Sequence, residues 1–348
     1  MSAALVSGYP HRMAGHCGSG ALRDLLEWAG LTYGQAPLGE GFAFGVGGVI
    51  GFSYLRAPGL GTPFYLVGRG SALTEQFSAR LGVGCERHAT DDPVEGWEGV
   101  RAELDEGRPV LCWAEMAELP YLRVSMRMTR HDIVLTGHDD RADTVTVVDN
   151  DRADPQTVSR ADLARARSAQ GFPAPTRHTW YRLRFPERLP DVRVVAASAC
   201  ADAARELASP SALPGMPGGA ATGIAGVERF VGDLDRWSGD FDEAGLDRAL
   251  FTLWVFVEKA GTGGGLFRRL QAEFLADLAE LLPEPAVAEA RDAWALLARA
   301  WTDLADHAKA KGPVAARLGE VRRHAQALPD LEARAAASLG AVADALAP

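Results

Sequence analysis

Cysteine is scarce in this sequence and widely spaced. The chain has only Cys17, Cys85, Cys112 and Cys200, and no two of them form a Cys-x-x-Cys pair. This spacing argues against a zinc site built from thiolates. We therefore expect reduced thiols and a cytoplasmic protein.

Long apolar runs and an excess of basic residues are also missing. No stretch of about 18 apolar residues occurs, which argues against a transmembrane helix. The first residues lack a charged segment followed by a long apolar core, so we expect no secretory signal. The net charge is −10, and we therefore expect no overall basic surface for nucleic acid or for an anionic membrane.

What is present suffices for two domains. The chain has 348 residues, of which 47% are hydrophobic. Short runs typical of β-strands come before residue 190, and Ala-rich helical patterns follow it. We predict an α+β protein with one domain over 1–190, an all-helical domain over 191–348 and a Pro- and Gly-rich linker near 208–223. In the helical domain the apolar residues that recur every three or four positions are Leu246, Leu250, Leu253, Trp254, Val257, Trp294, Leu297, Trp301 and Leu304.

The stretch PHRMAGHCGSGALRDLLEWAG, residues 10–30, places a thiol at the start of a predicted helix. The apolar face of that helix consists of Leu22, Leu25, Leu26 and Ala29. A thiolate at a helix N-terminus is stabilised by the macrodipole and by unpaired backbone N–H groups, and Gly18 and Gly20 allow another group to approach closely. Cys17 is thus a candidate nucleophile whose neighbouring N–H groups can bind an oxyanion. The alternative is a small buried cysteine that happens to start a helix.

A thiol nucleophile needs a base, and the segment RHDIVLTGHDDRADTVTVVDND supplies a candidate. We predict a β-hairpin with strands at 131–137 and 144–149. His131 begins the first strand and Asp149 ends the second, so strand pairing brings an imidazole next to a carboxylate that can fix its tautomer. Asn150 is an alternative for this orienting role. We prefer Asp149, because it continues the alternation of one strand face.

The remaining histidines are weaker candidates. His138 is expected in the hairpin turn, and a metal site made of His131, His138 and Asp149 has no HxH or HExxH spacing to support it. We therefore expect no metal. His16 adjoins Cys17, but neighbours at a helix entry point apart, so it is a poor base. The histidines expected at the surface or in packing are His88, His178, His307 and His324.

Several residues are candidates for substrate binding. Glu40 is the only charge in GEGFAFGVGGVIGFSYL, which we expect to form a packed loop and strand near the nucleophile. Glu115 and Tyr121 follow a predicted strand and are candidates for an acceptor pocket, although Tyr121 fits a core position equally well. Three arginines precede His131 and are suited either to docking an acidic carrier protein or its phosphopantetheine phosphate, or to a solvated loop. They are Arg123, Arg127 and Arg130.

Four segments, in this order, resemble the N-terminal domain of the butirosin biosynthesis protein H-like family. They are GHC before a helix, GEGFAFGVGGVIGFSY, GRPVLCWAEMAELPYL, and HDIVLTGHDD with its continuation to VVDND. The similarity covers about residues 8–185, and EKAGTGGGLFRRLQAEFL (258–275) resembles the helical domain that usually follows. The resemblance implies a papain-like fold, similar to that of cysteine peptidases, for residues 1–190.

The resemblance also implies an activity. The named member of the family moves an acyl group from an acyl-carrier-protein thioester to an amine of an aminoglycoside and forms an amide in antibiotic biosynthesis. Matched by position, the nucleophile is Cys17, the base His131 and the orienting carboxylate Asp149, in agreement with the residues alone. Papain-like enzymes usually place a glutamine of the oxyanion hole six residues before the cysteine. This sequence has His11 there, and the backbone N–H of Cys17 is the other donor.

We therefore expect a cysteine-dependent acyltransferase that forms an amide in a natural-product pathway. Its expected partners are an acyl carrier protein and a small-molecule amine, and it needs no bound cofactor because the acyl group arrives on phosphopantetheine. A homodimer is compatible with the sequence. Two alternatives stay open. A cysteine hydrolase (peptidase, amidase or thioesterase) shares the chemistry up to the acyl-enzyme, and the departure at His11 gives weight to a catalytically silent binding protein.

Overall fold

The computed structural model describes residues 3–57, 60–124, 127–209 and 219–347. The chain forms two compact units. One consists of residues 1–38 and 77–190, and the other of residues 39–76 and 191–348. Each unit therefore contains segments that lie far apart in the sequence.

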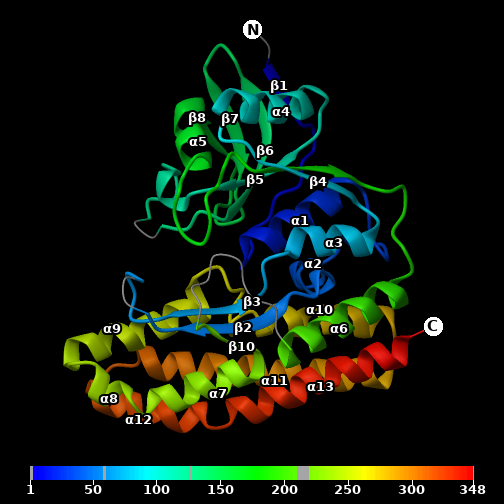
Figure 1. Ribbon diagram of the computed structural model, residues 1–348. Coiled ribbons are helices and arrows are strands. Elements are labelled where there is room, and N and C mark those ends of the chain that lie inside the picture. The colour runs from blue at the N-terminus through cyan, green and yellow to red at the C-terminus, as the bar shows by residue number, and fades with distance from the viewer. Residues whose placement is uncertain (1–2, 58–59, 125–126, 210–218, 348) are drawn as a thin grey trace. The chain divides into compact units, whose positions relative to one another are not determined.

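The first unit is built around one antiparallel sheet in the order β4-β9-β5-β6-β7-β8, with β1 also paired to β6 (Figure 1). Its strands are β1 (Ala3–Leu5), β4 (Gly84–His88), β5 (Val110–Ala114), β6 (His131–Asp139), β7 (Thr144–Val148), β8 (Gln156–Ser159) and β9 (Trp180–Arg184). Its helices are α1 (Cys17–Trp28), α4 (Pro93–Asp105), the 3-10 turn η1 (Met116–Glu118) and α5 (Arg160–Arg167), and α3 (Leu73–Leu81) contains the boundary between residues 76 and 77.

Strand β6 is the centre of this unit. Both α1 and α4 pack against it, and all of its residues except the last are buried. A strand with both faces covered consists of a nearly continuous apolar run instead of a strict alternation, and Ile133, Val134 and Leu135 form such a run. The first residue of this strand, His131, is thereby held on a rigid element.

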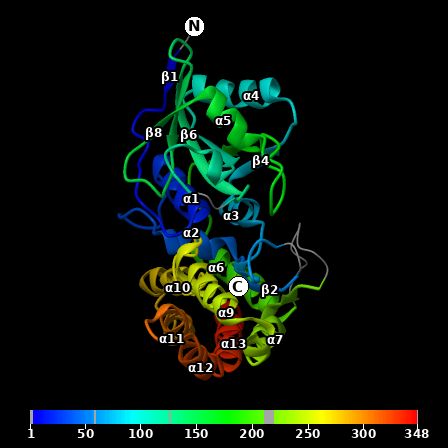
Figure 2. The ribbon, with the colours of Figure 1, turned by 90° about the vertical axis from the view of Figure 1, so that its left-hand side faces the viewer.

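The second unit contains the remaining helices and a small antiparallel sheet in the order β10-β2-β3. The strands are β2 (Ile50–Leu55), β3 (Tyr65–Arg69) and β10 (Ala221–Thr222). The helices are α2 (Glu40–Gly47), α6 (Val192–Ala208), α7 (Gly223–Leu234), α8 (Trp237–Asp240), α9 (Glu243–Trp254) with a π-helical turn (Val255–Lys259), α10 (Arg268–Leu281), α11 (Pro285–Lys309), α12 (Val314–Ala325) and α13 (Leu328–Leu346). Within this unit α11 packs against α10, α12 and α13 (Figure 2).

The bundle core follows the predicted helical period. Trp294 and Trp301 on α11 are fully buried, and each indole N–H has a partner. Trp294 donates to the carbonyl of Ala335 at 3.0 Å, and Trp301 donates to the carboxylate of Glu332 at 2.8 Å. Buried indoles are stable only when their N–H groups are satisfied in this way. Among the described residues, no helix is both long enough and apolar enough to span a membrane.

The units differ from the predicted sequence ranges in one segment. Residues 39–76 belong to the second unit, and their glycine-rich start is helix α2, not the predicted loop. A Cβ at Gly45 would overlap the ring of Phe274 on α10, so glycine is needed for the close approach of α2 to α10. Glycine lowers helix propensity, and the tertiary contact that compensates for it cannot be found from local sequence.

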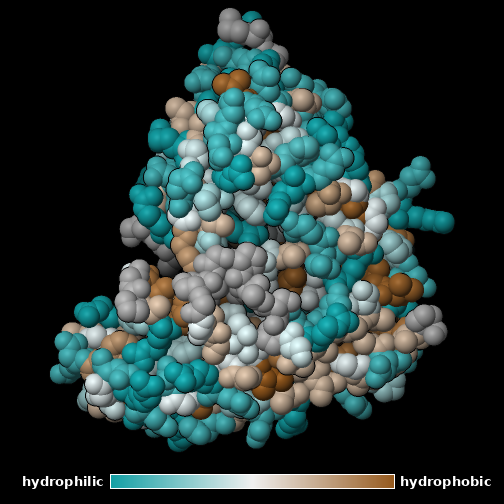
Figure 3. Space-filling model, viewed as in Figure 1, coloured by the Kyte–Doolittle hydropathy of each residue, from teal (hydrophilic) through white to brown (hydrophobic). Residues whose placement is uncertain are grey.

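Most of the predicted linker at 208–223 lies outside the described residues. Of the rest, Ala208 ends α6, while Ala221 and Thr222 form β10. On the face shown in Figure 3, hydrophobic residues occur in small groups among hydrophilic ones, as is usual for a protein surface.

Candidate active site

Cys17 is the first residue of α1, as predicted from the sequence. His16 caps the helix, because its Nδ1 accepts a hydrogen bond from the backbone N–H of Ser19 at 3.2 Å. The apolar face of α1 is buried, which anchors the helix. Cys17 is half-buried, and it occupies the positive end of the helix dipole.

Asn150 connects the end of the hairpin to this helix. Its side-chain amide donates to the carboxylate of Asp24 on α1 at 2.7 Å and to the carbonyl of Arg12 at 2.8 Å. A Cβ at Gly20 would lie 2.8 Å from the side chain of Asn150, so this glycine permits the close approach that the sequence suggested. Because Asn150 is used in this way, Asp149 is the residue left to orient the histidine.

His131 and Asp149 form a buried ion pair. Nε2 of His131 lies 2.7 Å from Oδ2 of Asp149, and the carboxylate is fully buried. The hairpin predicted from the sequence positions the two residues. Val134 pairs with Val148, and His131 and Asp149 lie just beyond this pair, at the end of the hairpin away from its turn. Asp149 receives two further hydrogen bonds, from the hydroxyl of Tyr121 at 2.8 Å and from the backbone N–H of Asp151 at 3.0 Å.

The protonation behaviour of the pair follows from these contacts. Burial opposes the charge on Asp149, but His131 and the hydrogen bonds from Asp151 and Tyr121 outweigh it and lower the pKa of the carboxyl group. Burial likewise opposes protonation of His131. The charge and hydrogen bond of Asp149, followed by those of Cys17, raise the pKa of His131 well above its ordinary value. Since Asp149 uses Nε2, Nδ1 is the ring nitrogen available to the thiol.

Asp132 is a neighbour of the thiol that the sequence did not reveal. The Sγ of Cys17 lies 4.0 Å from Oδ2 of Asp132, which is mostly buried on β6 opposite Trp113. The thiol is placed to donate a long hydrogen bond to this carboxylate. The only signal in the sequence was that Asp132 directly follows His131.

One ring nitrogen of His11 has a hydrogen-bond partner. Its Nε2 donates to the carbonyl of Arg152 at 2.6 Å, whereas its Nδ1 lies 3.7 Å from the carboxylate of Asp24 without a hydrogen bond. The neutral ring has a single N–H, which the carbonyl uses. A role of His11 in an oxyanion hole would require this hydrogen bond to break. The backbone N–H of Cys17 precedes the first intrahelical hydrogen bond, which runs from Gly20 to the carbonyl of His16.

The predicted acceptor residues have structural partners. Glu115 is buried, and its Oε1 accepts from the backbone N–H groups of Ala117 at 3.2 Å and Met128 at 2.8 Å. It thus holds the loop that carries Tyr121. Tyr121 contacts the ion pair through its hydrogen bond to Asp149. It therefore acts on His131 only through this carboxylate.

The arginines predicted to dock a carrier protein lie on this same loop. Arg130 stacks over the ring of Trp113, with 4.2 Å between the guanidinium carbon and the ring centroid. Arg127 forms an exposed ion pair with Glu118 at 3.5 Å, and Arg123 has a left-handed backbone conformation with φ of 54°. Arg123 and Arg127 are thus exposed, whereas Arg130 is partly buried.

Two sequence expectations differ from the structure. His138 lies within β6, not in a turn, because the strand continues to Asp139 and pairs with β7 beyond the predicted end. It is buried, and its Nε2 lies 2.8 Å from Asp105; it is therefore committed to another carboxylate and is not grouped with His131. Glu40 begins helix α2 in the other compact unit, not the loop and strand that the sequence predicted.

Comparison with known protein families gives two matches along the chain. Residues 16–150 match the family described as "Butirosin biosynthesis protein H, N-terminal", and residues 161–339 match a domain of unknown function, DUF4872. The first match begins one residue before Cys17 and ends one residue after Asp149. No curated protein matches the chain.

Proposed function

This chain belongs to the family of butirosin biosynthesis protein H, and we propose that it is a cysteine-dependent acyltransferase of natural-product biosynthesis. One observation carries the proposal. The half-buried thiol of Cys17, at a helix N-terminus, interacts with His131, whose Nε2 is held by a fully buried carboxylate. Nucleophile, base and orienting group of a cysteine acyl-transfer enzyme have this arrangement.

The reaction proceeds in two halves through an acyl-enzyme. The thiolate of Cys17 attacks the carbonyl carbon of an acyl thioester, and the pantetheine sulfur leaves as its thiol after taking a proton from His131. An amine then attacks the acyl-enzyme, His131 accepts the amine proton, and the C–S bond to Cys17 breaks. The products are an amide and the free enzyme, with the proton returned to the Cys17–His131 pair.

The surrounding residues support each step. Asp149 fixes the His131 tautomer in which Nε2 carries hydrogen and Nδ1 faces the thiol, and Tyr121 and the backbone of Asp151 hold Asp149 in place. The N–H of Cys17 at the start of α1 is the donor best suited to bind the oxyanion of the tetrahedral intermediate. His11 would contribute only after releasing the carbonyl of Arg152.

A papain-like arrangement of the first unit is part of this proposal. A helix that begins with the nucleophile, followed by an antiparallel sheet that supplies histidine and then the orienting residue, agrees with it. The proposed donor is an acyl group on the phosphopantetheine of an acidic carrier protein, and Arg127 is the exposed cation closest in sequence to His131. The proposed acceptor is a small-molecule amine.

The test is the pH dependence of alkylation of each cysteine, followed by trapping of an acyl-enzyme. We expect Cys17 to react far faster than Cys112 and Cys200 at about pH 6, well below the usual pKa of a free thiol. Burial raises the pKa of Cys112 to about 11, which makes it an internal reference. Incubation with an acyl-pantetheine thioester should then add one acyl group to the wild-type chain and to Cys85→Ala, but none to Cys17→Ala.

The fate of the acyl group separates transfer from hydrolysis. Release of the free acid at the same rate with and without amines would replace the acyltransferase by a hydrolase of the same architecture. Slow alkylation of Cys17, with no acyl adduct, would overturn both the acyltransferase and the hydrolase. The remaining alternative would then be a catalytically silent binding protein. Asp132, 4.0 Å from the sulfur, is the contact that would then explain the unreactive thiol.

A further inference from the structure

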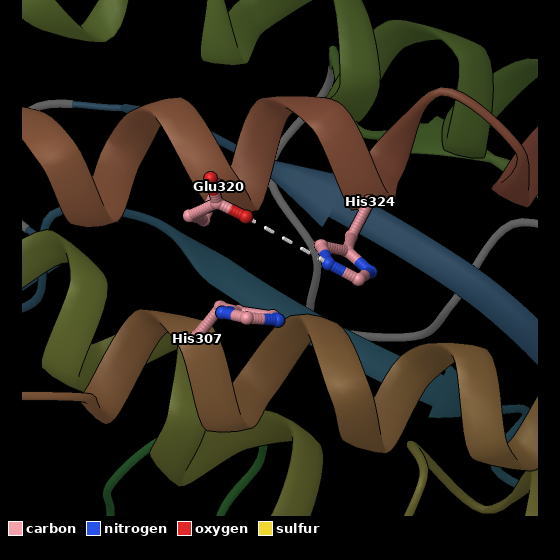
Figure 4. Close-up of side chains that lie close together, drawn as sticks. All are labelled: His307, Glu320 and His324. Carbon is pink, nitrogen blue, oxygen red and sulfur yellow. Dashed lines mark ion pairs between the residues drawn. The ribbon is translucent and has the colours of Figure 1, made fainter.

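A group of metal-binding side chains lies on two helices of the second unit. His307 lies in the last turn of α11, and Glu320 and His324 lie one turn apart on α12. Figure 4 shows the three side chains turned toward one another in the space between these helices. One possible ligand atom from each of them lies within 4.8 Å of the other two. Among the described residues, this is the group of three histidine, cysteine or carboxylate side chains that is close enough to hold a metal ion.

The two imidazoles are close and nearly parallel. Their ring centroids are 4.2 Å apart and their planes differ by 28°. Two imidazolium ions at this distance would repel each other. The neutral ring is the form that binds metal ions.

Arg323 supplies the positive charge near this group in the present structure. Its Nη2 lies 2.9 Å from Nε2 of His324 and also contacts the carboxylate of Glu320. The side chain of Arg323 is mostly exposed, so it can move into solvent at little cost, because exposed ion pairs of this type contribute little free energy. A cation of higher charge can therefore replace it.

We propose that His307, Glu320 and His324 form a binding site for a divalent transition-metal ion of the zinc class. Two imidazoles and one carboxylate are a ligand set that zinc prefers. Zinc–nitrogen bonds of about 2.0–2.1 Å place tetrahedral ligand atoms about 3.3 Å apart, so the stacked rings must turn about their Cβ–Cγ bonds until a nitrogen of each faces the same ion. The bound ion links α11 to α12 and keeps a fourth position for water. This proposal is independent of the acyl-transfer reaction.

The test is titration of the full chain with Zn²⁺, monitored by calorimetry. The parent is the Cys17→Ser chain, so that the thiol of the other site does not bind the ion. We expect one equivalent of zinc to bind. His307→Ala and His324→Ala should each weaken zinc binding at least tenfold, because even the loss of a residue that only supports a metal ligand typically costs about tenfold in affinity. His88→Ala is the matched control. His88 also has a carboxylate neighbour, Glu86 at 3.4 Å, but is not part of this group, and its removal should leave the affinity unchanged.

A second variant tests the site in the opposite direction. Arg323→Ala removes the competing cation but keeps all three proposed ligands, so it should tighten zinc binding several-fold. Zinc should also raise the melting temperature of the parent but not of His307→Ala, because only the folded chain brings α11 and α12 together. Cobalt bound at this site should give a visible spectrum without a thiolate charge-transfer band.

The outcomes separate clearly. Equal zinc affinity in the parent and in both histidine variants would overturn the proposal, as would zinc binding that Arg323→Ala weakens. A cobalt spectrum with a thiolate band would move the site to a cysteine and also overturn it. Circular dichroism of each metal-free variant shows whether a lost affinity reflects a lost ligand or a lost fold.

Discussion

A buried ion pair in the first unit and another in the second differ in what their cations can do. In the first unit His131 pairs with Asp149, beside the half-buried thiol of Cys17. In the second unit Arg268 pairs with Glu332 at 2.8 Å, and both side chains are fully buried. Both carboxylates accept an additional side-chain hydrogen bond, from a tyrosine in one case and a tryptophan in the other.

The difference shows how similar charge pairing serves chemistry in one place and structure in another. Histidine can gain and lose a proton near neutral pH, whereas arginine stays protonated in proteins. Arg268 also donates to the carbonyls of Leu266 at 2.8 Å and Gly68 at 3.2 Å, so it connects segments of the fold. The first pair adjoins a nucleophile, and the second adjoins only the core of the bundle.

The largest expected effect is the loss of reaction rate when the carboxylate of Asp149 is removed in the first unit. In Asp149→Ala, His131 loses the acceptor that fixes its tautomer, and we expect acyl-enzyme formation to slow by a factor of about 10²–10⁴, the usual contribution of general acid–base catalysis. Asp149→Asn keeps an oxygen acceptor and should recover part of the rate. The measurement is acyl-enzyme formation from an acyl-pantetheine thioester by intact mass. A folded Asp149→Ala chain with the wild-type rate would contradict the triad.

The equivalent change in the second unit should affect stability instead. Glu332→Ala leaves Arg268 as a buried charge without its partner, and we expect the free energy of unfolding to fall by about 3–5 kcal/mol. Exchange of both residues for apolar ones, Arg268→Met with Glu332→Leu, should cost less, because no charge is then left unpaired. Chemical denaturation measures both. If Glu332→Ala unfolds at the wild-type denaturant concentration, the pair does not stabilise the bundle.

The contact between His131 and Asp149 and the helix start at Cys17 could be predicted because their signals are local. A cysteine before a helical period, and a hairpin with histidine and aspartate at its ends, are visible in single short segments. The contact of Tyr121 with Asp149 and that of Asp132 with Cys17 could not be predicted. The contact of Tyr121 depends on a loop held by Glu115, and that of Asp132 depends on the packing of α1 against β6. No short-range pattern contains such contacts.

The fold shows the same limit. The helical period predicted the bundle core at Trp294 and Trp301, because a buried helix face repeats within a few residues. The assignment of 39–76 to the second unit was not predicted, since it depends on the packing of α2 against α10, more than 200 residues away. Likewise, His307 and His324 lie on different helices, and their proximity had no signature in the spacing.

The pH dependence of stability should distinguish the two ion pairs. The raised pKa of His131 contributes stability that is fully present below its ordinary value of 6.5 and is lost as the pH rises through the folded-state value. The lowered pKa of Asp149 contributes stability that is present above its ordinary value of 3.8 and is lost as the pH falls through the folded-state value. The free energy of unfolding, measured from pH 3 to pH 9, should therefore depend less on pH in Asp149→Ala than in the wild type. The arginine of the second pair adds no loss on the alkaline side. Equal pH profiles for the two chains would show that the His131–Asp149 pair is not linked to folding.

The smallest expected effect comes from a single hydroxyl, and it tests whether Tyr121 acts through Asp149. Tyr121→Phe removes the 2.8 Å hydrogen bond to Oδ2, which is one of the contacts that lower the pKa of Asp149. The pKa of the carboxyl group should therefore rise toward its ordinary value, and the acidic limb of the rate profile should move to higher pH. A hydrogen bond to a charged group contributes about 1.5–3 kcal/mol to stability; Tyr121 acts on the reaction only indirectly, so we expect a rate loss near the lower end of this range, about tenfold at neutral pH. Tyr54→Phe is the matched control, because Tyr54 donates in the same way to Asp233 at 3.1 Å in the second unit and should leave the rate profile unchanged. If both variants lower the rate equally and neither shifts the acidic limb, Tyr121 supports only the fold, and the contact with Asp149 does not tune the catalytic histidine.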